Sequence, residues 1–148
     1  MAGQFELDMA RFVKKAKGDI DLVVRKVALD LFLRVIMKSP VDTGRFKSNW
    51  VVGIGSIPNA SFTFDETQHK NKRGSKARRN SAGADAIARV QAASVSFAGG
   101  QIIYLVNNLA YSRALEYGHS KQAPGGMVRI TVQEYRGVVT KAASEVNK

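Results

Sequence analysis

The feature that most constrains the fold is a run of apolar residues between positions 19 and 38 at the spacing of an α-helix. Apolar side chains recur there every three or four residues, at Ile20, Val24, Val27, Leu31 and Val35. Charged side chains occupy the other side of the same run, so the pattern predicts an amphipathic helix. A helix of this kind has to bury its apolar face against a sheet or a neighbouring subunit.

The six residues after this run predict where the helix ends. Pro40 has no backbone N–H and biases the preceding residue away from helical angles. Asp42 and Thr43 can accept hydrogen bonds from nearby backbone N–H groups, and Gly44 permits a sharp change of direction. We therefore expect the helix to stop, the chain to turn and a new element to begin at Arg45. An ordinary helix-terminating turn is the simplest interpretation of these residues alone.

The remaining pattern predicts one α+β domain over residues 1–148. A shorter helix is expected at residues 5–16, separated from the long one by Gly18, with Asp19 as the N-cap. The other expected elements are strands at residues 50–55, 60–64 and 102–106, the last of them central, and helices at 84–93, 111–117 and 128–146. The start of the last helix stays open, because residues 127–132 also have strand composition. Long N-terminal and C-terminal helices would then pack on a small, mostly antiparallel sheet.

Composition excludes several classes of site. The 148 residues include no Cys, which excludes disulfides, thiolate catalysis and Cys-based zinc sites. The N-terminus has neither the basic region nor the apolar core of a signal peptide, and no run approaches the roughly 20 apolar residues of a membrane span. We therefore expect no contact with a membrane.

The net charge of +11 indicates an anionic partner, and half of the excess lies in one short segment. Six cations fall within ten residues: Lys70, Lys72, Arg73, Lys76, Arg78 and Arg79. Residues 68–83 contain almost no apolar side chain, so we expect a flexible basic loop. It could bind phosphates without reading sequence, since no aromatic residue interrupts the cations. The favoured interpretation is a solvated loop or one that meets an acidic protein neighbour.

Catalytic motifs are absent from the sequence. The two histidines, His69 and His119, are 50 positions apart and lack a metal-spaced carboxylate motif. Neither a nucleophile elbow of the form Gly-x-Ser-x-Gly nor a phosphate-binding Gly-rich loop is found. We therefore expect no enzymatic activity, no metal and no cofactor, and we interpret His119 as a loop residue.

A second notable segment, residues 111–118, has two interpretations. On a short helix closed by Gly118 as its left-handed cap, Arg113 and Glu116 lie three residues apart and can form a surface ion pair. The same helix carries Tyr111 and Tyr117, and two tyrosines with an arginine are also typical of a protein interface. The sequence favours neither interpretation over the other.

The two segments together resemble a known family. Residues 39–50, which read Ser-Pro-Val-Asp-Thr-Gly-Arg-Phe-Lys-Ser-Asn-Trp, are similar to a signature that follows the first helix in the HK97 gp10-like family of small tailed-phage morphogenesis proteins. Residues 111–120 resemble that family's second signature, and Pro124 lies where its lead into the last helix falls. The order, spacing and chain length agree with the family, whereas the basic insertion at residues 68–83 does not align.

This resemblance implies a structural protein of the virion, assembled in the host cytoplasm. Such proteins complete the tail or join the tail tube to the head–tail connector, commonly as a ring of subunits, here expected to be a hexamer. In a ring one face of a subunit meets a different face of the next. We expect Asp42, Thr43, Gly44 and Arg45 to position the following strand, and the 111–117 helix to contribute to a subunit or neck contact. A non-specific nucleic-acid-binding protein remains the alternative.

Overall fold

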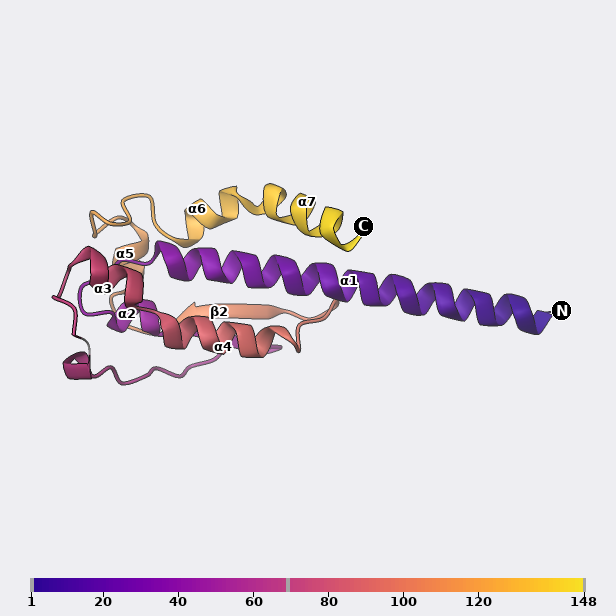
Figure 1. Ribbon diagram of the computed structural model, residues 1–148, viewed down its shortest axis with the longest axis horizontal. Coiled ribbons are helices and arrows are strands. Elements are labelled where there is room, and N and C mark those ends of the chain that lie inside the picture. The colour runs from indigo at the N-terminus through magenta and orange to yellow at the C-terminus, as the bar shows by residue number, and fades with distance from the viewer. Residues whose placement is uncertain (1, 69, 148) are drawn as a thin grey trace.

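A computed structural model describes residues 2–68 and 70–147 (Figure 1). Its elements are α1 (Ala2–Lys38), α2 (Arg45–Ser48), β1 (Trp50–Ile54), the 3₁₀ turn η1 (Glu66–Gln68), α3 (Lys76–Ser81), α4 (Ala84–Ser94), β2 (Ile103–Asn107), α5 (Ser112–Glu116), α6 (Val128–Gln133) and α7 (Tyr135–Val146). Helix α1 runs through the middle, with α6 and α7 along one side and the sheet and α4 along the other. The expected α+β class, with long terminal helices and a small antiparallel sheet, is confirmed.

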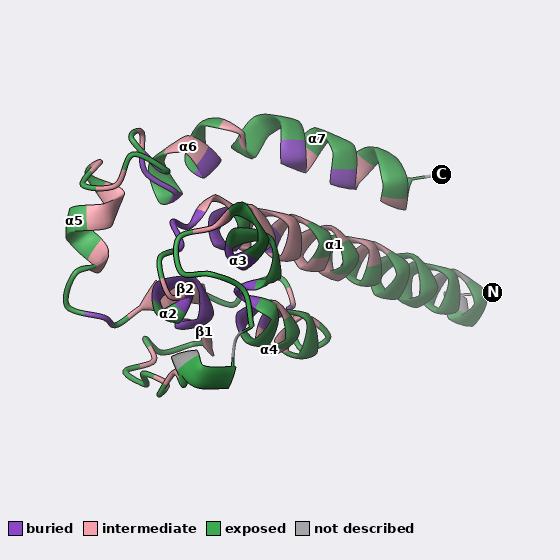
Figure 2. Cartoon of the chain, turned by 60° about the vertical axis from the view of Figure 1, so that its left-hand side comes forward, coloured by how far each residue is buried: buried purple, intermediate pink, exposed green. Residues whose placement is uncertain are grey.

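Helix α1 is longer than the sequence predicted. It continues without a break through Gly18 and Asp19, so the expected interruption and the N-cap at Asp19 are wrong. A glycine inside a helix costs about 1 kcal/mol, which does not end a helix that has no proline. The predicted end at residue 38 is confirmed, and there the Ser39 hydroxyl donates to the Val35 carbonyl at 2.9 Å. The N-terminal half of α1 projects beyond the rest of the chain (Figures 1 and 2).

The sheet has two antiparallel strands, which pair from Trp50 opposite Asn107 to Ile54 opposite Ile103. The strands expected at residues 50–55 and 102–106 are confirmed to within one residue, but β2 is not central, because within the described residues it pairs only with β1. The strand expected at residues 60–64 is wrong. That segment satisfies its backbone through asparagine side chains: Phe62 N–H donates to Asn49 Oδ1 at 2.7 Å.

The C-terminal helix is confirmed over its predicted range, with one bend. Helices α6 and α7 meet at Glu134, whose N–H donates to the Thr131 carbonyl three residues earlier at 3.0 Å. Lys38 and Arg34 of α1 both form ion pairs with the Glu134 carboxylate. These cations lower the pKa of Glu134 and attach the bend to α1.

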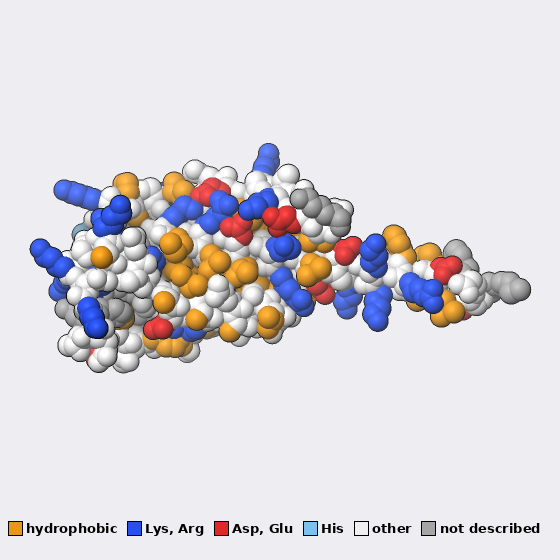
Figure 3. All heavy atoms as spheres, viewed as in Figure 1, with side chains coloured by type: hydrophobic (Ala, Val, Ile, Leu, Met, Phe, Trp, Pro, Cys, Tyr) orange, Lys and Arg blue, Asp and Glu red, His pale blue; other side chains and the backbone are white. Residues whose placement is uncertain are grey.

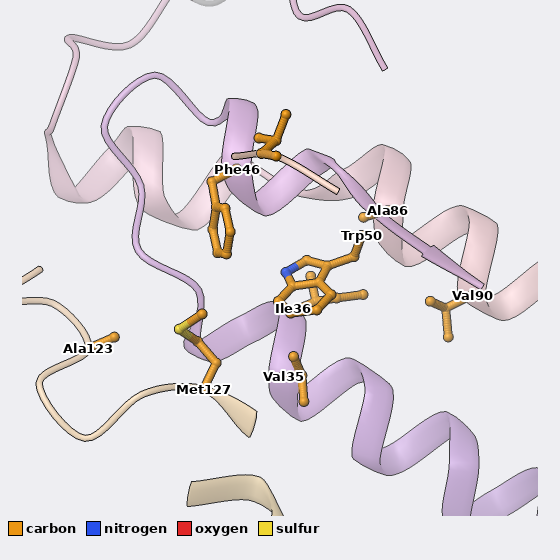
Figure 4. Packing of buried hydrophobic residues seen from close by; sticks show 9 residues of the cluster. Val35, Ile36, Phe46, Trp50, Ala86, Val90, Ala123 and Met127 are labelled. Atoms are coloured by element: carbon orange, nitrogen blue, oxygen red, sulfur yellow. The ribbon is translucent and has the colours of Figure 1, made fainter. Parts of the chain in front are cut away.

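The core lies where the C-terminal end of α1 meets α2, β1 and α4 (Figure 4). Its buried members are Val35, Ile36, Phe46, Trp50, Ala86, Val90, Leu109, Ala123 and Met127. The Trp50 and Phe46 rings meet edge to face with their centroids 5.7 Å apart. The indole N–H of Trp50 donates to the Ser39 hydroxyl at 2.8 Å, so the residue before Pro40 is tied to the start of β1. Each large apolar side chain buried here contributes about 1.5–3 kcal/mol.

Candidate functional site

The turn after α1 and the basic segment, thirty residues apart in the sequence, meet in the structure. The Arg73 guanidinium forms an ion pair with the Asp42 carboxylate at 2.5 Å, and Gly74 N–H donates to the Asp42 carbonyl at 3.0 Å. The hydrogen bond from Arg73 lowers the pKa of Asp42. Within the turn, the Thr43 hydroxyl accepts from Arg45 N–H at 3.1 Å, as the sequence predicted.

Arg78 is buried between the turn after α1 and the basic segment and links them. Only 4% of this residue is exposed. Its guanidinium donates to the Thr43 carbonyl at 2.7 Å and to the Asn71 carbonyl, from Nε, at 2.9 Å. Gly44, at φ 110°, completes the turn that presents the Thr43 carbonyl to this guanidinium. Arg78 is therefore bound to carbonyls of its own chain and buried there, whereas the sequence predicted a cation in a flexible loop.

The basic segment, which the sequence predicted as a flexible loop, contains regular structure at residues 76–81, where helix α3 forms. The Ser75 hydroxyl caps α3 by accepting from Arg78 N–H at 3.1 Å. Lys47, which is 3% exposed, donates from Nζ to the Arg79 carbonyl at 3.0 Å, and burial lowers its pKa. Charged side chains that bond to main-chain carbonyls thus replace the apolar contacts that the segment lacks.

The six predicted cations therefore divide into two groups. Arg78 is buried, and Arg73, although exposed, is paired with Asp42. The remaining four are exposed: Lys70, Lys72, Lys76 and Arg79. These four leave a positive surface beside the turn that an anionic partner could reach.

A groove of about 390 Å³ lies between this turn and the region of α5. It is lined by Pro40, Val41, Asp42, Thr43, Gly44, Arg45, Phe46, Arg73, Tyr111, Leu115, Ser120 and Gln122. The Gln122 side-chain amide closes it by accepting from Val41 N–H and donating to the Val41 carbonyl, both at 2.9 Å. The Tyr111 ring lies 5.9 Å from that of Phe46, and burial raises the pKa of Tyr111.

Glu116, at the end of α5, caps the next helix. Its carboxylate accepts from the backbone N–H groups of Met127, Val128 and Arg129 at 2.9, 3.0 and 2.9 Å. Burial by itself would raise the pKa of Glu116, but these three donors and the Arg129 side chain outweigh it, so the pKa lies below its ordinary value. The surface pair expected with Arg113 is replaced by these bonds, and the Arg113 guanidinium lies 5.8 Å from the Tyr117 ring centre.

Two glycines shape this region. Gly118 has φ 91° and closes α5 as the predicted left-handed cap, with His119 N–H donating to the Ala114 carbonyl at 3.1 Å. Gly126 has φ 87°, and a Cβ there would lie 2.5 Å from the Glu116 carbonyl oxygen. The close approach at Gly126 allows the Glu116 carboxylate to reach the start of α6.

The predicted site residues thus form two neighbouring clusters. Asp42, Thr43, Gly44, Arg45, Arg73 and Tyr111 line the groove, whereas Arg113, Glu116, Tyr117 and Gly118 surround the link from α5 to α6. Sequence reasoning missed Lys47, Gln122 and Arg129. Pro124 and the two glycines after it did mark a tight lead into the last helix, but no local pattern points to Gln122.

The side chains of this site form hydrogen bonds, ion pairs and aromatic contacts. Within residues 2–68 and 70–147, no group of three or more His, Cys, Asp or Glu residues is placed to hold a metal ion. His119 is exposed, and His69 lies outside the described residues. None of the helices in the described part of the chain combines the length and apolar character needed to cross a membrane.

Comparison of the chain with protein-family models, with curated proteins and with solved structures found no match. Functional inference therefore depends on the geometry of the two clusters and on the motifs that they contain.

Proposed function

We propose that this chain is a structural virion protein of a tailed phage that completes the tail or joins it to the head connector as a ring of subunits. One observation supports this proposal above the others. The two segments that carry the family resemblance line one groove, where the Phe46 ring of the first lies 5.9 Å from the Tyr111 ring of the second. Gln122, just beyond the second segment, is hydrogen-bonded to Val41 of the first. Motifs that share one surface are more consistent with a common binding role than two separate turns would be.

The surfaces around the groove favour a protein partner. Tyr117 is 64% exposed, and Arg113 beside it is exposed. Exposed tyrosine and arginine are the side chains most enriched at the energetic centres of interfaces. The exposed cations of the basic segment would meet an acidic neighbour in the ring, on the connector or on the tail tube.

The test is light-scattering mass and negative-stain imaging of the purified protein, with and without isolated tail tubes. We expect rings, or a cap at one end of the tubes. The double variant Arg113→Ala/Tyr117→Ala should reduce capped ends several-fold, whereas Arg136→Ala/Lys141→Ala, which truncates two exposed cations of α7, should leave them unchanged. A protein that leaves the tubes bare under all conditions would refute the proposal.

Non-specific nucleic-acid binding is the second candidate, favoured by the four exposed cations in one short segment. If they neutralise four phosphates, the logarithm of the binding constant should fall with the logarithm of salt at a slope of about −3.6. Replacement of Lys70, Lys72, Lys76 and Arg79 by Gln should abolish that slope. Replacement of four other exposed cations, Lys15, Lys121, Arg136 and Lys141, should leave most of it. Equal loss from both sets would exclude the segment as a DNA site.

A further inference from the structure

The N-terminal half of α1 carries an exposed apolar stripe, whose last residue, Ile20, lies beside Gly99. We define the N-terminal stripe as Met9, Phe12, Val13, Ala16 and Ile20, whose spacing of three and four residues places them on one face of the helix. Phe12 is 68% exposed, and Val13 and Ile20 are 58% and 57% exposed. An apolar face of this length on a projecting helix marks an interaction surface.

The same helix forms the floor of an apolar groove further along. Two adjoining hollows of about 210 and 310 Å³ share Leu31, Phe32 and Tyr135. We call them together the α1 groove; its lining residues are Val23, Val24, Val27, Ala28, Leu31, Phe32, Val35, Ile103, Leu105, Val128, Thr131, Val132, Tyr135 and Val139. Figure 3 shows apolar side chains gathered on this face of the body, between α7 and the sheet side, and again along the projecting end of α1.

The N-terminal stripe and the groove floor face the same way. Val23, Val27 and Leu31 follow Ile20 at steps of three, four and four residues, so they continue the stripe along the same side of α1. The apolar side chains of the groove walls remain open to solvent: Val132 is 65% and Tyr135 51% exposed. One chain thus presents an unpartnered apolar helix next to an unpartnered apolar groove.

We propose that the α1 groove is occupied by the N-terminal stripe of a second copy of this chain. The projecting stretch from Ala2 to Ile20 is about 28 Å long, and the groove floor from Val23 to Val35 spans about 18 Å, so one helix covers the groove. This proposal extends the ring of subunits proposed above by naming the surfaces through which copies meet.

The area available corresponds to a small interface. The stripe from Met9 to Ile20 and the groove floor are each about 18 Å long, so a helix face about 10 Å wide covers on the order of 200 Å² of each. In a reciprocal pair each copy contributes both a stripe and a groove, so on the order of 400 Å² per copy is buried. This area is below the about 600–1,000 Å² per partner of a stable complex and matches an association that depends on protein concentration. Because stripe and groove are different surfaces, the contact can repeat from copy to copy and close a ring, or form reciprocally between two copies.

Because the sequence contains no cysteine, disulfide cross-linking between introduced cysteines tests the proposal without interference from native thiols. Two single-cysteine variants, Phe12→Cys on the stripe and Tyr135→Cys in the groove, are mixed in equal amounts under mild oxidation. A disulfide requires Cα atoms within about 7 Å. We expect the mixed Phe12–Tyr135 product to dominate and each variant alone to cross-link at least tenfold less. Dominant cross-linking of Phe12→Cys with itself would mean that stripe meets stripe, and would overturn the proposal.

A charge variant gives a second readout with a matched control. Phe12→Asp buries an unpaired carboxylate in the contact and should weaken association about 30-fold or more, as loss of an interface hot spot does. Leu7→Asp places the same charge at a residue 54% exposed on the opposite side of the helix, and should leave the mass unchanged. Both variants are expected to retain the wild-type melting profile at a concentration where all are monomeric.

The outcomes separate this inference from the proposed function. Oligomers that depend on Phe12 but leave tail tubes bare would support the inference and count against the phage role. Rings that cap tubes and persist in Phe12→Asp would support the phage role and overturn the inference. A monomer whose N-terminal half binds anionic lipid vesicles, with Lys14, Lys15 and Lys17 at the surface, would also overturn it.

Discussion

Replacement of Arg78 by Met tests how the basic segment is held. The substitution keeps an unbranched chain in the buried site but removes the donors to the Thr43 and Asn71 carbonyls. A hydrogen bond from a charged donor contributes about 1.5–3 kcal/mol, and an abandoned buried acceptor costs about 1–3 kcal/mol. The variant no longer bears the free-energy cost of burying a charged guanidinium, which offsets part of this loss. We expect a net loss of about 2–3 kcal/mol in the free energy of unfolding.

The adjacent exposed cation supplies the control. Arg79→Met removes the same charge at the next position, but the wild-type side chain there is exposed. Each variant removes one positive charge from a chain of net charge +11, so both lower the repulsion among the remaining cations by a similar amount. Urea unfolding followed by circular dichroism, at one protein concentration, measures the difference. At about 2–4 °C per kcal/mol, the melting temperature of Arg78→Met should lie about 4–12 °C below that of Arg79→Met.

Equal stability of the two variants would refute the reasoning. It would mean that the Thr43 and Asn71 carbonyls find other donors or water, and that Arg78 is not the link between the turn and the segment. Limited proteolysis gives an independent readout. Cleavage at Lys70 and Lys72 should accelerate in Arg78→Met and stay at the wild-type rate in Arg79→Met, because only the first variant releases the segment from the turn.

Two further predictions concern the link from α5 to α6. The pKa of Glu116 is lowered on folding, so the contribution of its carboxylate to the free energy of unfolding is present above the unfolded pKa of about 4.3 and is lost as pH falls through the folded pKa. Glu116→Gln should therefore lower the free energy of unfolding by about 1–2 kcal/mol at pH 7, and by progressively less below about pH 5, in urea titrations. A difference between wild type and variant that stays constant down to pH 3 would contradict this. Gly126→Ala should destabilise the protein by about 1–3 kcal/mol more than Gly74→Ala in thermal melts. Both glycines have positive φ, but a Cβ at Gly126 would lie 2.5 Å from the Glu116 carbonyl oxygen, whereas a Cβ at Gly74 meets nothing within 4 Å. Equal losses of stability would show that only the backbone strain matters.

The local signals in the sequence account for most of the secondary structure. The end of α1 follows from Pro40, which cannot continue a helix, and the two strands follow from short runs rich in Val, Ile and aromatic residues. The left-handed cap at Gly118 was predictable for the same reason, since a residue without a Cβ adopts positive φ at little cost. These features depend on neighbours in the sequence, and so the sequence alone predicts them.

Contacts between distant segments decided the rest. The run at residues 60–64 has strand composition, yet it does not pair as a strand, and the side chains of Asn49 and Asn108 hydrogen-bond to its backbone. Arg78 looked like its charged neighbours until the fold brought the Thr43 carbonyl to it, thirty-five positions away. Glu116 likewise found its partners only where the start of α6 returned to α5.

The difference between the features that the sequence predicts and those that the tertiary structure decides has a physical cause. Periodicity, proline and glycine act through backbone geometry within a few residues, whereas a buried cation or carboxylate is stable only when the tertiary structure delivers donors and acceptors that replace water. The basic segment shows both effects, because its composition excludes an apolar core while its order comes from main-chain carbonyls elsewhere in the chain. The sequence by itself determined most of the helices, the turn and the charge, and only the tertiary structure decided which of the charges are buried and which are exposed.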